Sequence, residues 1–245
     1  MFFGIGSNME NTNLFEGEVL LVNKPLGWTS FDVVKKIRNL LRNYFKVKKI
    51  KVGHAGTLDP LASGLLVVCT GKFTKRINEF QAQEKEYTGT FSLGATTPSY
   101  DLETEVDEIF SIAHIKDEDI HAATKKFIGT IEQFPPIFSA LKKNGERLYE
   151  KARRGELVQV DARQVHIHEF EITRKEMPEI DFRVVCSKGT YIRSLAHDFG
   201  KELNSGAHLS ALCRTRIGNF HLNQAIDIEI LKDYIETQDI PTCDV

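Results

Sequence analysis

Residues 53–64 (GHAGTLDPLASG) place an imidazole, a hydroxyl and a carboxylate close together in the sequence. The three glycines and one proline of this segment exclude a continuous helix, so we expect His54, Thr57 and Asp59 to be displayed on a tight turn. The apolar run that follows, residues 65–69, predicts a buried strand. A carboxylate on a loop can do chemistry, but Asp before Pro is also ordinary turn chemistry. The segment alone leaves catalysis and a structural turn both open.

Composition indicates a soluble globular protein. The chain has 245 residues, of which 41% are hydrophobic, and this is enough to bury a full core. No apolar stretch reaches the roughly 20 residues of a membrane span, and the first residues lack the pattern of a signal peptide. We therefore expect a cytoplasmic protein without membrane contact. Neither of the two glycine-rich phosphate-binding motifs is present, and we expect no cofactor.

The cysteines and the neighbouring histidines do not have the spacing of a metal site. No C-x-x-C pair occurs among the four cysteines, which are Cys69, Cys186, Cys213 and Cys243. We interpret them as reduced, mostly structural thiols rather than zinc ligands. His166 and His168 share one side of a predicted strand, but no third ligand is near them in the sequence. We expect no metal.

Charge is segregated along the chain, although the net charge is only −2. Residues 32–51 and 142–154 are strongly basic, whereas acidic residues gather in 101–119 and in the C-terminal tail. The basic side chains are Lys35, Lys36, Arg38, Arg42, Lys46, Lys48, Lys49 and Lys51 in the first run, and Lys142, Lys143, Arg147, Lys151, Arg153 and Arg154 in the second. Such runs can be solvated helix faces or a surface for a polyanion, and both interpretations stay open.

Apolar periodicity predicts mixed helices and strands without a regular βαβ repeat. The clearest helix begins after Thr29 or Ser30 and turns its basic residues outward. Further helices are expected at 73–80, 117–127, 190–203 and 227–235, and strands at 19–22, 65–69, 87–93, 131–134, 158–173, 180–187 and 214–222. Residues 139–156 are polar and basic, helical only in their second half, and are expected to form a mobile excursion. We predict an α+β fold with a largely antiparallel sheet, as one elaborated domain.

Five separate segments together resemble one protein family. They are residues 22–30 (VNKPLGWTS), 53–64 (GHAGTLDPLASG), 85–87 (KEY), 135–142 (PPIFSALK) and 187–195 (SKGTYIRSL). In this order they resemble the TruB-type tRNA pseudouridine synthases, and the resemblance extends from about residue 20 to residue 222. It implies the pseudouridine synthase fold, with a largely antiparallel mixed central sheet flanked by helices.

The resemblance also implies how the chain is organised. It predicts a single catalytic domain with a core at about 18–222 and a thumb-like RNA-binding insertion at about 136–160. Only a short acidic tail, 223–245, follows, so we expect the bacterial form without a C-terminal PUA domain. The expected partner is the T-arm stem-loop of tRNA, bound by a monomer.

The implied reaction is the isomerisation of a T-arm loop uridine, position 55 of tRNA, to pseudouridine. This reaction breaks the N1–C1′ bond, forms a C5–C1′ bond and needs no cofactor. By the resemblance, Asp59 is the essential carboxylate, as nucleophile or as base. Arg193 is the guanidinium that pairs with this carboxylate, and Tyr191 is the candidate for taking the C5 proton.

The resemblance assigns further residues to substrate binding. Tyr87 is expected to stack on the flipped uracil, Leu212 to make an apolar contact with it, and His54 to contact the extruded nucleotide. Lys24 belongs to the Lys-Pro pattern of the family, where it can act directly or can pack beside the site with a solvated amine.

Two assignments concern the surroundings of the site. Lys142, Lys143 and Arg147 in the insertion are expected to bind the RNA backbone. Asp101, in a loop with an unusual proline, can be a site residue or a turn residue.

Two other functions compete with the isomerase: a glycosidase-like hydrolase, which would need a second acid, and a non-catalytic RNA-binding protein, which would not need Asp59.

Overall fold

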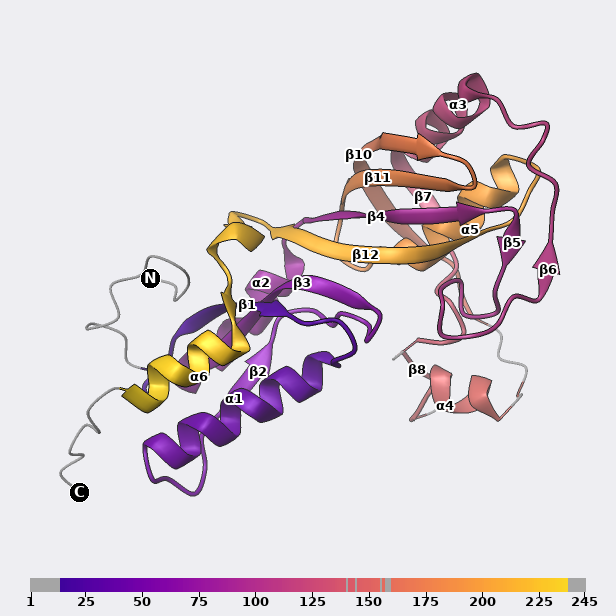
Figure 1. The fold of residues 1–245 in the computed structure, drawn as a ribbon. Helices are drawn as coiled ribbons and strands as arrows, with labels where there is room; N and C mark the ends of the chain where they lie inside the picture. Colours follow the sequence, from indigo (N-terminus) through magenta and orange to yellow (C-terminus); the bar gives the residue numbers. More distant parts are fainter. Residues whose placement is uncertain (1–13, 140, 144, 155, 157–159, 238–245) are drawn as a thin grey trace. The chain divides into compact units, whose positions relative to one another are not determined.

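The computed structural model describes residues 14–139, 141–143, 145–154, 156 and 160–237 (Figure 1). Residues 1–13 therefore lie outside the described residues, and Cys243 lies outside them as well. The chain divides into two compact units, residues 1–85 with 213–245, called unit 1, and residues 86–212, called unit 2. The prediction of a single catalytic domain stays a prediction.

Unit 1 is built on a mixed sheet with helices. Its strand order is β14-β1-β3-β12, with β2 also paired to β3 and β13 to β12. The strands are β1 (Val19–Lys24), β2 (Val52–His54), β3 (Ala62–Thr70), the C-terminal part of β12 (Ala207–Ile217), β13 (Phe220–His221) and β14 (Ile226–Asp227). The helices are α1 (Ser30–Tyr44), η2 (Gly71–Arg76), α2 (Ile77–Ala82), η3 (Leu222–Gln224) and α6 (Ile228–Thr237). β1 is antiparallel to β3 and parallel to β14.

Helix α1 begins where the sequence predicts it. Thr29 is the N-cap: its hydroxyl accepts a hydrogen bond from the Asp32 amide (3.0 Å), and the Asp32 carboxylate accepts one from the Thr29 amide (3.0 Å). This reciprocal capping box satisfies two amides that the first helical turn leaves without partners. The predicted helix is confirmed.

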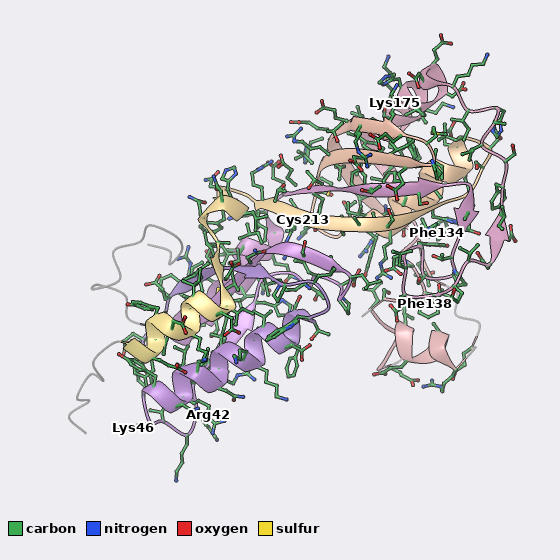
Figure 2. The ribbon with its side chains drawn as sticks, in the orientation of Figure 1. Arg42, Lys46, Phe134, Phe138, Lys175 and Cys213 are labelled. Atoms are coloured by element: carbon green, nitrogen blue, oxygen red, sulfur yellow. The ribbon has the colours of Figure 1, made fainter. Side chains whose placement is uncertain are left out.

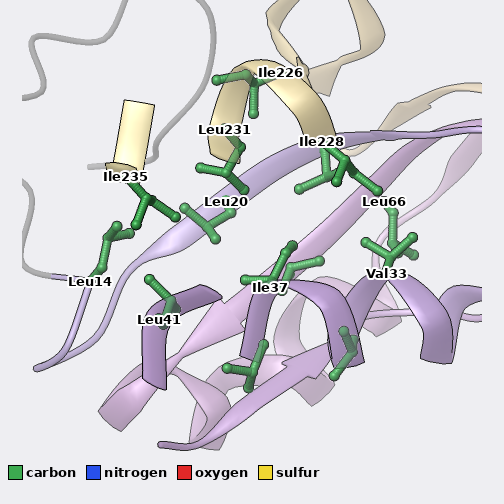
Figure 3. Packing of buried hydrophobic residues seen from close by; sticks show 14 residues of the cluster. Leu14, Leu20, Val33, Ile37, Leu41, Leu66, Ile226, Ile228, Leu231 and Ile235 are labelled. Carbon is green, nitrogen blue, oxygen red and sulfur yellow. The ribbon is translucent and has the colours of Figure 1, made fainter. Parts of the chain in front are cut away.

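The core of unit 1 lies on both faces of β1 and β3. Alternate residues of each strand point to opposite faces, so Leu20 and Leu66 pack against α1 and α6, whereas Leu21 and Leu65 pack on the other side (Figure 3). A strand that is buried on both faces reads as a continuous apolar run, which is how the sequence presents residues 65–69. The thiol of Cys69 is part of this core, and burial raises its pKa to about 12.

Unit 2 has the strand order β12-β4-β11-β10-β7. Its strands are the N-terminal part of β12, β4 (Lys85–Leu93), β5 (Ala95–Thr96), β6 (Glu108–Ile109), β7 (Gly129–Gln133), β8 (Lys142–Lys143), β9 (Glu146–Arg147), β10 (Arg163–Glu176) and β11 (Glu179–Cys186). Lys85, the first residue of β4, is the last residue of the first segment of unit 1. Its helices are α3 (Asp117–Phe127), α4 (Leu148–Arg153) and α5 (Ile192–Glu202). β10 is antiparallel to both β7 and β11. Aromatic rings fill the core, with Phe91 and Phe182 stacked at 4.1 Å between ring centroids.

The α+β prediction is confirmed, and the differences from the sequence-based elements lie at their boundaries and in short strands that were not expected. The strand expected at 214–222 begins earlier, at Ala207, and ends at Ile217. The short strands β5 and β6, which pair with each other, are among those not expected. The excursion at 139–156 has a short β8–β9 hairpin before α4, so it is helical in its second half as expected. Among the described residues, no helix is long and apolar enough to cross a membrane.

Gly64 marks a close approach of two backbones in unit 1. It lies in β3 with φ +101°, and a Cβ atom there would sit 2.4 Å from the carbonyl oxygen of Arg214 in β12. Such a distance is too short for any side-chain carbon, and the backbone of a neighbouring strand cannot move away easily. Gly27, also at positive φ (+82°), has open space around its missing side chain.

We predict that Gly64→Ala lowers the free energy of unfolding by about 2–4 kcal/mol, because overpacking adds to the strain of a positive φ. Gly27→Ala, which adds only the strain, is expected to cost about 1–2 kcal/mol. Urea denaturation followed by the fluorescence of Trp28, the only tryptophan and a residue of unit 1, measures both. Equal losses in the two variants would show that the close backbone contact has no energetic effect.

Candidate active site

Asp59 lies in the loop between β2 and β3, where it is half-buried. The residue before it, Leu58, is held on both of its backbone groups by the Ser30 hydroxyl: this hydroxyl accepts from the Leu58 amide (2.8 Å) and donates to the Leu58 carbonyl (3.1 Å). The carbonyl of the residue after it, Pro60, accepts a hydrogen bond from the Gly27 amide (2.8 Å). The backbone on both sides of Asp59 is therefore fixed to the start of α1 and to the turn that follows β1. The predicted display on a loop is confirmed for Thr57 and Asp59 but is wrong for His54, which belongs to β2.

Arg214 of β12 joins the start of the same loop to strand β3, which follows it, and sequence reasoning missed this residue. Its side chain is fully buried; Nε donates to the Leu65 carbonyl (2.8 Å) and Nη2 to the Gly56 carbonyl (3.1 Å). Arginine is almost never buried without a specific partner, so an Arg within an otherwise strand-like segment was the signal available in the sequence.

Lys24, the last residue of β1, is also fully buried. Its ammonium donates to the carbonyls of Pro25 (2.9 Å) and Trp28 (2.6 Å). Burial lowers the pKa of Lys24 to about 8; the nearby Asp59 charge acts in the opposite direction, and the Arg214 charge lowers the pKa further. A solvated amine at Lys24, one of the two alternatives from the sequence, is therefore wrong.

His54 ends β2, directly before the Asp59 loop. Burial lowers its pKa below the ordinary value, and the positive charge of Arg214 adds to this effect. A neutral imidazole at pH 7 is the form that can lie against a nucleobase without carrying a charge into a buried site. His54, Lys24, Arg214 and Asp59 all belong to unit 1, and the charges of Asp59, Arg214 and Asp32 all act on the buried ammonium of Lys24.

In unit 2, Arg193 lies in the first turn of α5 and is buried. Its Nε lies 3.6 Å from Oδ2 of the buried Asp101, and its Nη1 donates to the Ser99 carbonyl (3.3 Å). Asp101 also accepts a hydrogen bond from the Glu103 amide (3.0 Å), so it has a turn role and an ion-pair role at once. The pairing of Arg193 with Asp59 stays a prediction.

Tyr191 is the N-cap residue of α5, and its backbone is fixed by a residue that sequence reasoning missed. The buried Gln133 side chain accepts from the Tyr191 amide (2.7 Å) and donates to the Tyr191 carbonyl (3.0 Å). The Arg163 guanidinium stacks over the Tyr191 ring at 4.3 Å from its centroid. Two-point backbone fixation and a cation over the ring together orient this side chain.

The other predicted substrate contacts are on strands of unit 2. Tyr87 in β4 is 9% exposed, and Leu212 in β12 is half-buried. Lys142, Lys143 and Arg147 belong to the β8–β9 hairpin, but their side chains lie outside the described part of the structure. Among the described residues, no group of three or more His, Cys, Asp or Glu side chains has the arrangement of a metal site.

Comparison with known proteins gives one consistent result across sequence and structure. Residues 42–192 match the N-terminal domain of TruB family pseudouridylate synthases, and residues 193–241 match a C-terminal domain of tRNA pseudouridylate synthase B. A tRNA pseudouridine synthase B of Flavobacterium johnsoniae is 61% identical over 222 residues, which cover 90% of this chain and 97% of the relative. The enzyme of the same name from Phocaeicola vulgatus is 54% identical over 93% of this chain and 97% of its own length.

Among solved structures, a Cbf5–Nop10–Gar1 complex contains a chain that is similar with a TM-score of 0.68 and 31% identity. An H/ACA RNP bound to a substrate RNA containing 2′-deoxyuridine gives a TM-score of 0.65 and 29% identity. Both matches cover 90% of this chain, which spans only about half the length of those chains, 55% and 54%. The fold and the sequence agree: this chain belongs to the TruB family of pseudouridylate synthases.

Proposed function

We propose that this protein converts the uridine at position 55, in the T-arm loop of tRNA, into pseudouridine, with Asp59 as the essential carboxylate and without a cofactor. One observation carries the proposal: Asp59 is the carboxylate of a loop whose backbone is fixed on both sides, and it interacts electrostatically with the buried ammonium of Lys24. A structural Asp-Pro turn needs none of this surrounding charge. The relatives named tRNA pseudouridine synthase B support tRNA as the substrate.

The chemistry needs a single carboxylate. Breaking the N1–C1′ bond develops positive charge at the sugar C1′, which a carboxylate can attack directly or stabilise while it acts as a base. The freed uracil stays bound, turns, and is rejoined through C5, so no water has to be activated by a second acid. The ammonium of Lys24 interacts electrostatically with Asp59, whose carboxylate form is the reactive form in either role.

The remaining site residues act on the uracil and its nucleotide. A uridine inside an RNA loop cannot reach a carboxylate until it is extruded, and extrusion costs a few kcal/mol of stacking energy. Stacking on Tyr87, contact with Leu212 and contact of neutral His54 with the extruded nucleotide would offset this cost. After the new bond forms, Tyr191 in its phenolate form accepts the proton from C5, and N1, which has lost its bond to C1′, gains a proton in exchange. Gln133 and Arg163 position Tyr191 for that step.

The insertion at about 136–160 is proposed to bind the RNA backbone through Lys142, Lys143 and Arg147. In the described part of this segment, Arg154 forms ion pairs with Glu146 (2.7 Å) and Glu156 (2.7 Å), which join the hairpin to the end of α4. The T-arm as the bound element, a monomeric enzyme and a cytoplasmic location stay predictions.

Asp59→Asn tests the proposal directly. We expect the release of tritium from C5-labelled uridine in a T-arm transcript to fall by at least about 10³-fold, because the amide can neither attack C1′ nor act as a base. Binding of the same transcript should be retained. Asp233→Asn, which changes an exposed carboxylate of α6, is the matched control and should keep full activity.

Chromatography of the nucleosides separates the competing functions. A glycosidase-like enzyme would release free uracil, and an RNA-binding protein would give neither product. If Asp59→Asn still forms pseudouridine at the wild-type rate, the assignment of Asp59 fails.

A second prediction concerns the pH dependence of stability. Below about pH 8, Lys24 is protonated in both the folded and the unfolded chain; between about pH 8 and its ordinary value of 10.5, only the unfolded chain keeps the proton. The free energy of unfolding of the wild type should therefore rise with pH across this window relative to that of Lys24→Met. Urea denaturation of both proteins from pH 7 to pH 10 measures the difference. If the difference in the free energy of unfolding stays constant over this range, the pKa of Lys24 is not lowered in the folded protein.

A further inference from the structure

The outer surface of α1 and of the segment that follows it carries eight cations that the proposed chemistry does not use. We call it the α1 surface; its residues are Lys35, Lys36, Arg38, Arg42, Lys46, Lys48, Lys49 and Lys51. Between residues 32 and 51 the only acidic residue is Asp32, which caps the helix. The whole chain has a net charge of −2, so this concentration of positive charge is a local feature.

Helical periodicity places the charges on the outside. The residues that α1 buries, among them Val33, Ile37 and Leu41, pack into the core of unit 1 (Figure 3). Lys35 and Arg42 lie away from this buried face and are exposed. Figure 2 shows Arg42 and Lys46 at the C-terminal end of α1, on the outside of unit 1.

Among the described residues, the counter-charge seen near the α1 surface is the carboxylate of Asp32, which interacts electrostatically with Lys35. Within the described part of the chain, none of the eight forms an ion pair, and the Arg38 guanidinium donates instead to the Val52 carbonyl (2.9 Å). Several cations in unit 2, by contrast, form ion pairs: Lys126 pairs with Glu202, and Arg174 pairs with Asp181 (2.6 Å). Like charges collected without partners repel one another and destabilise the folded state, which an external polyanion would reverse.

The α1 surface begins at the Asp59 loop. Ser30, the first residue of α1, makes both hydrogen bonds to Leu58, and the helix then extends for 15 residues. At 1.5 Å per residue, the surface reaches about 20 Å away from the residue proposed to do the chemistry. An RNA held at Asp59 and continuing along α1 would place its phosphates beside these cations.

We propose that the α1 surface binds backbone phosphates of the substrate RNA outside the reacting nucleotide. The inference rests on the proposed function, because it takes the RNA that enters the Asp59 site as the ligand. Lysine and arginine on a helix face recognise the phosphodiester backbone without reading base sequence. The surface therefore contributes affinity and orientation, not the choice of uridine.

The test neutralises three exposed cations together, in the variant Lys35→Gln, Arg42→Gln, Lys49→Gln. The matched control is Lys126→Gln, Arg174→Gln, Lys175→Gln, which changes net charge equally but removes cations that already have carboxylate partners. Filter binding of a full-length tRNA transcript is measured from 50 to 300 mM NaCl. The plot of log affinity against log salt should flatten by about 2 to 3 in the first variant, because each neutralised cation no longer binds about one phosphate.

Each outcome decides the proposal. It stands if only the α1 variant flattens the salt dependence while the tritium-release rate at saturating tRNA stays at the wild-type value. It is overturned if the slope of log affinity against log salt is unchanged in the α1 variant, or if the control variant lowers this slope equally. It is also overturned if the α1 variant binds tRNA like the wild type and loses only its binding to phosphatidylserine vesicles. Thermal denaturation of both variants verifies that each is folded. Because binding is measured independently of turnover, a wild-type protein that binds tRNA but forms no pseudouridine would refute the proposed function and not the α1 surface.

Discussion

The geometry of unit 1 depends on one buried guanidinium. Arg214 donates to the carbonyl of Gly56 at the start of the Asp59 loop and to that of Leu65 in β3, the strand that follows the loop. A buried charged group that lost these acceptors would carry a large desolvation penalty, so the loop cannot move away from Arg214 without that cost. Gly64 is required by the same arrangement, since any side chain there would collide with the Arg214 backbone. The loop that displays Asp59 is in this way part of the core of unit 1.

The same guanidinium shapes the electrostatics of the site. Its charge adds to burial in lowering the pKa of Lys24 and of His54, so the two neighbours respond in one direction to one cation. The negative charges of Asp59 and, to a smaller extent, Asp32 oppose this effect at Lys24. Unit 2 uses a comparable device, in which Asp101 holds the buried Arg193. Both units thus keep ionised groups inside, where an effective dielectric constant lower than that of water strengthens their influence on a substrate.

Local rules were enough to predict α1, the Asp59 loop and the α+β fold, because capping residues, glycine and proline positions and apolar periodicity act over a few residues. What the sequence could not show are partners that are far apart in the chain. Arg214 meets Leu65 across 149 residues, and Gln133 meets Tyr191 across 58. Strand β12 was predicted too short because its first residues, Ala207 to Ser210, mix small and polar side chains that gain strand structure only by pairing in the sheet.

The most direct test of this account is hydrogen–deuterium exchange in Arg214→Lys, which keeps the charge but loses the fork of donors, combined with the single-turnover rate on tRNA. The account predicts faster exchange confined to the amides of residues 55–66, with a rate about 10- to 100-fold lower and an unchanged affinity for tRNA. Protection and rate both equal to those of the wild type would contradict it, because the Asp59 loop would then hold its position without the Arg214 hydrogen bonds.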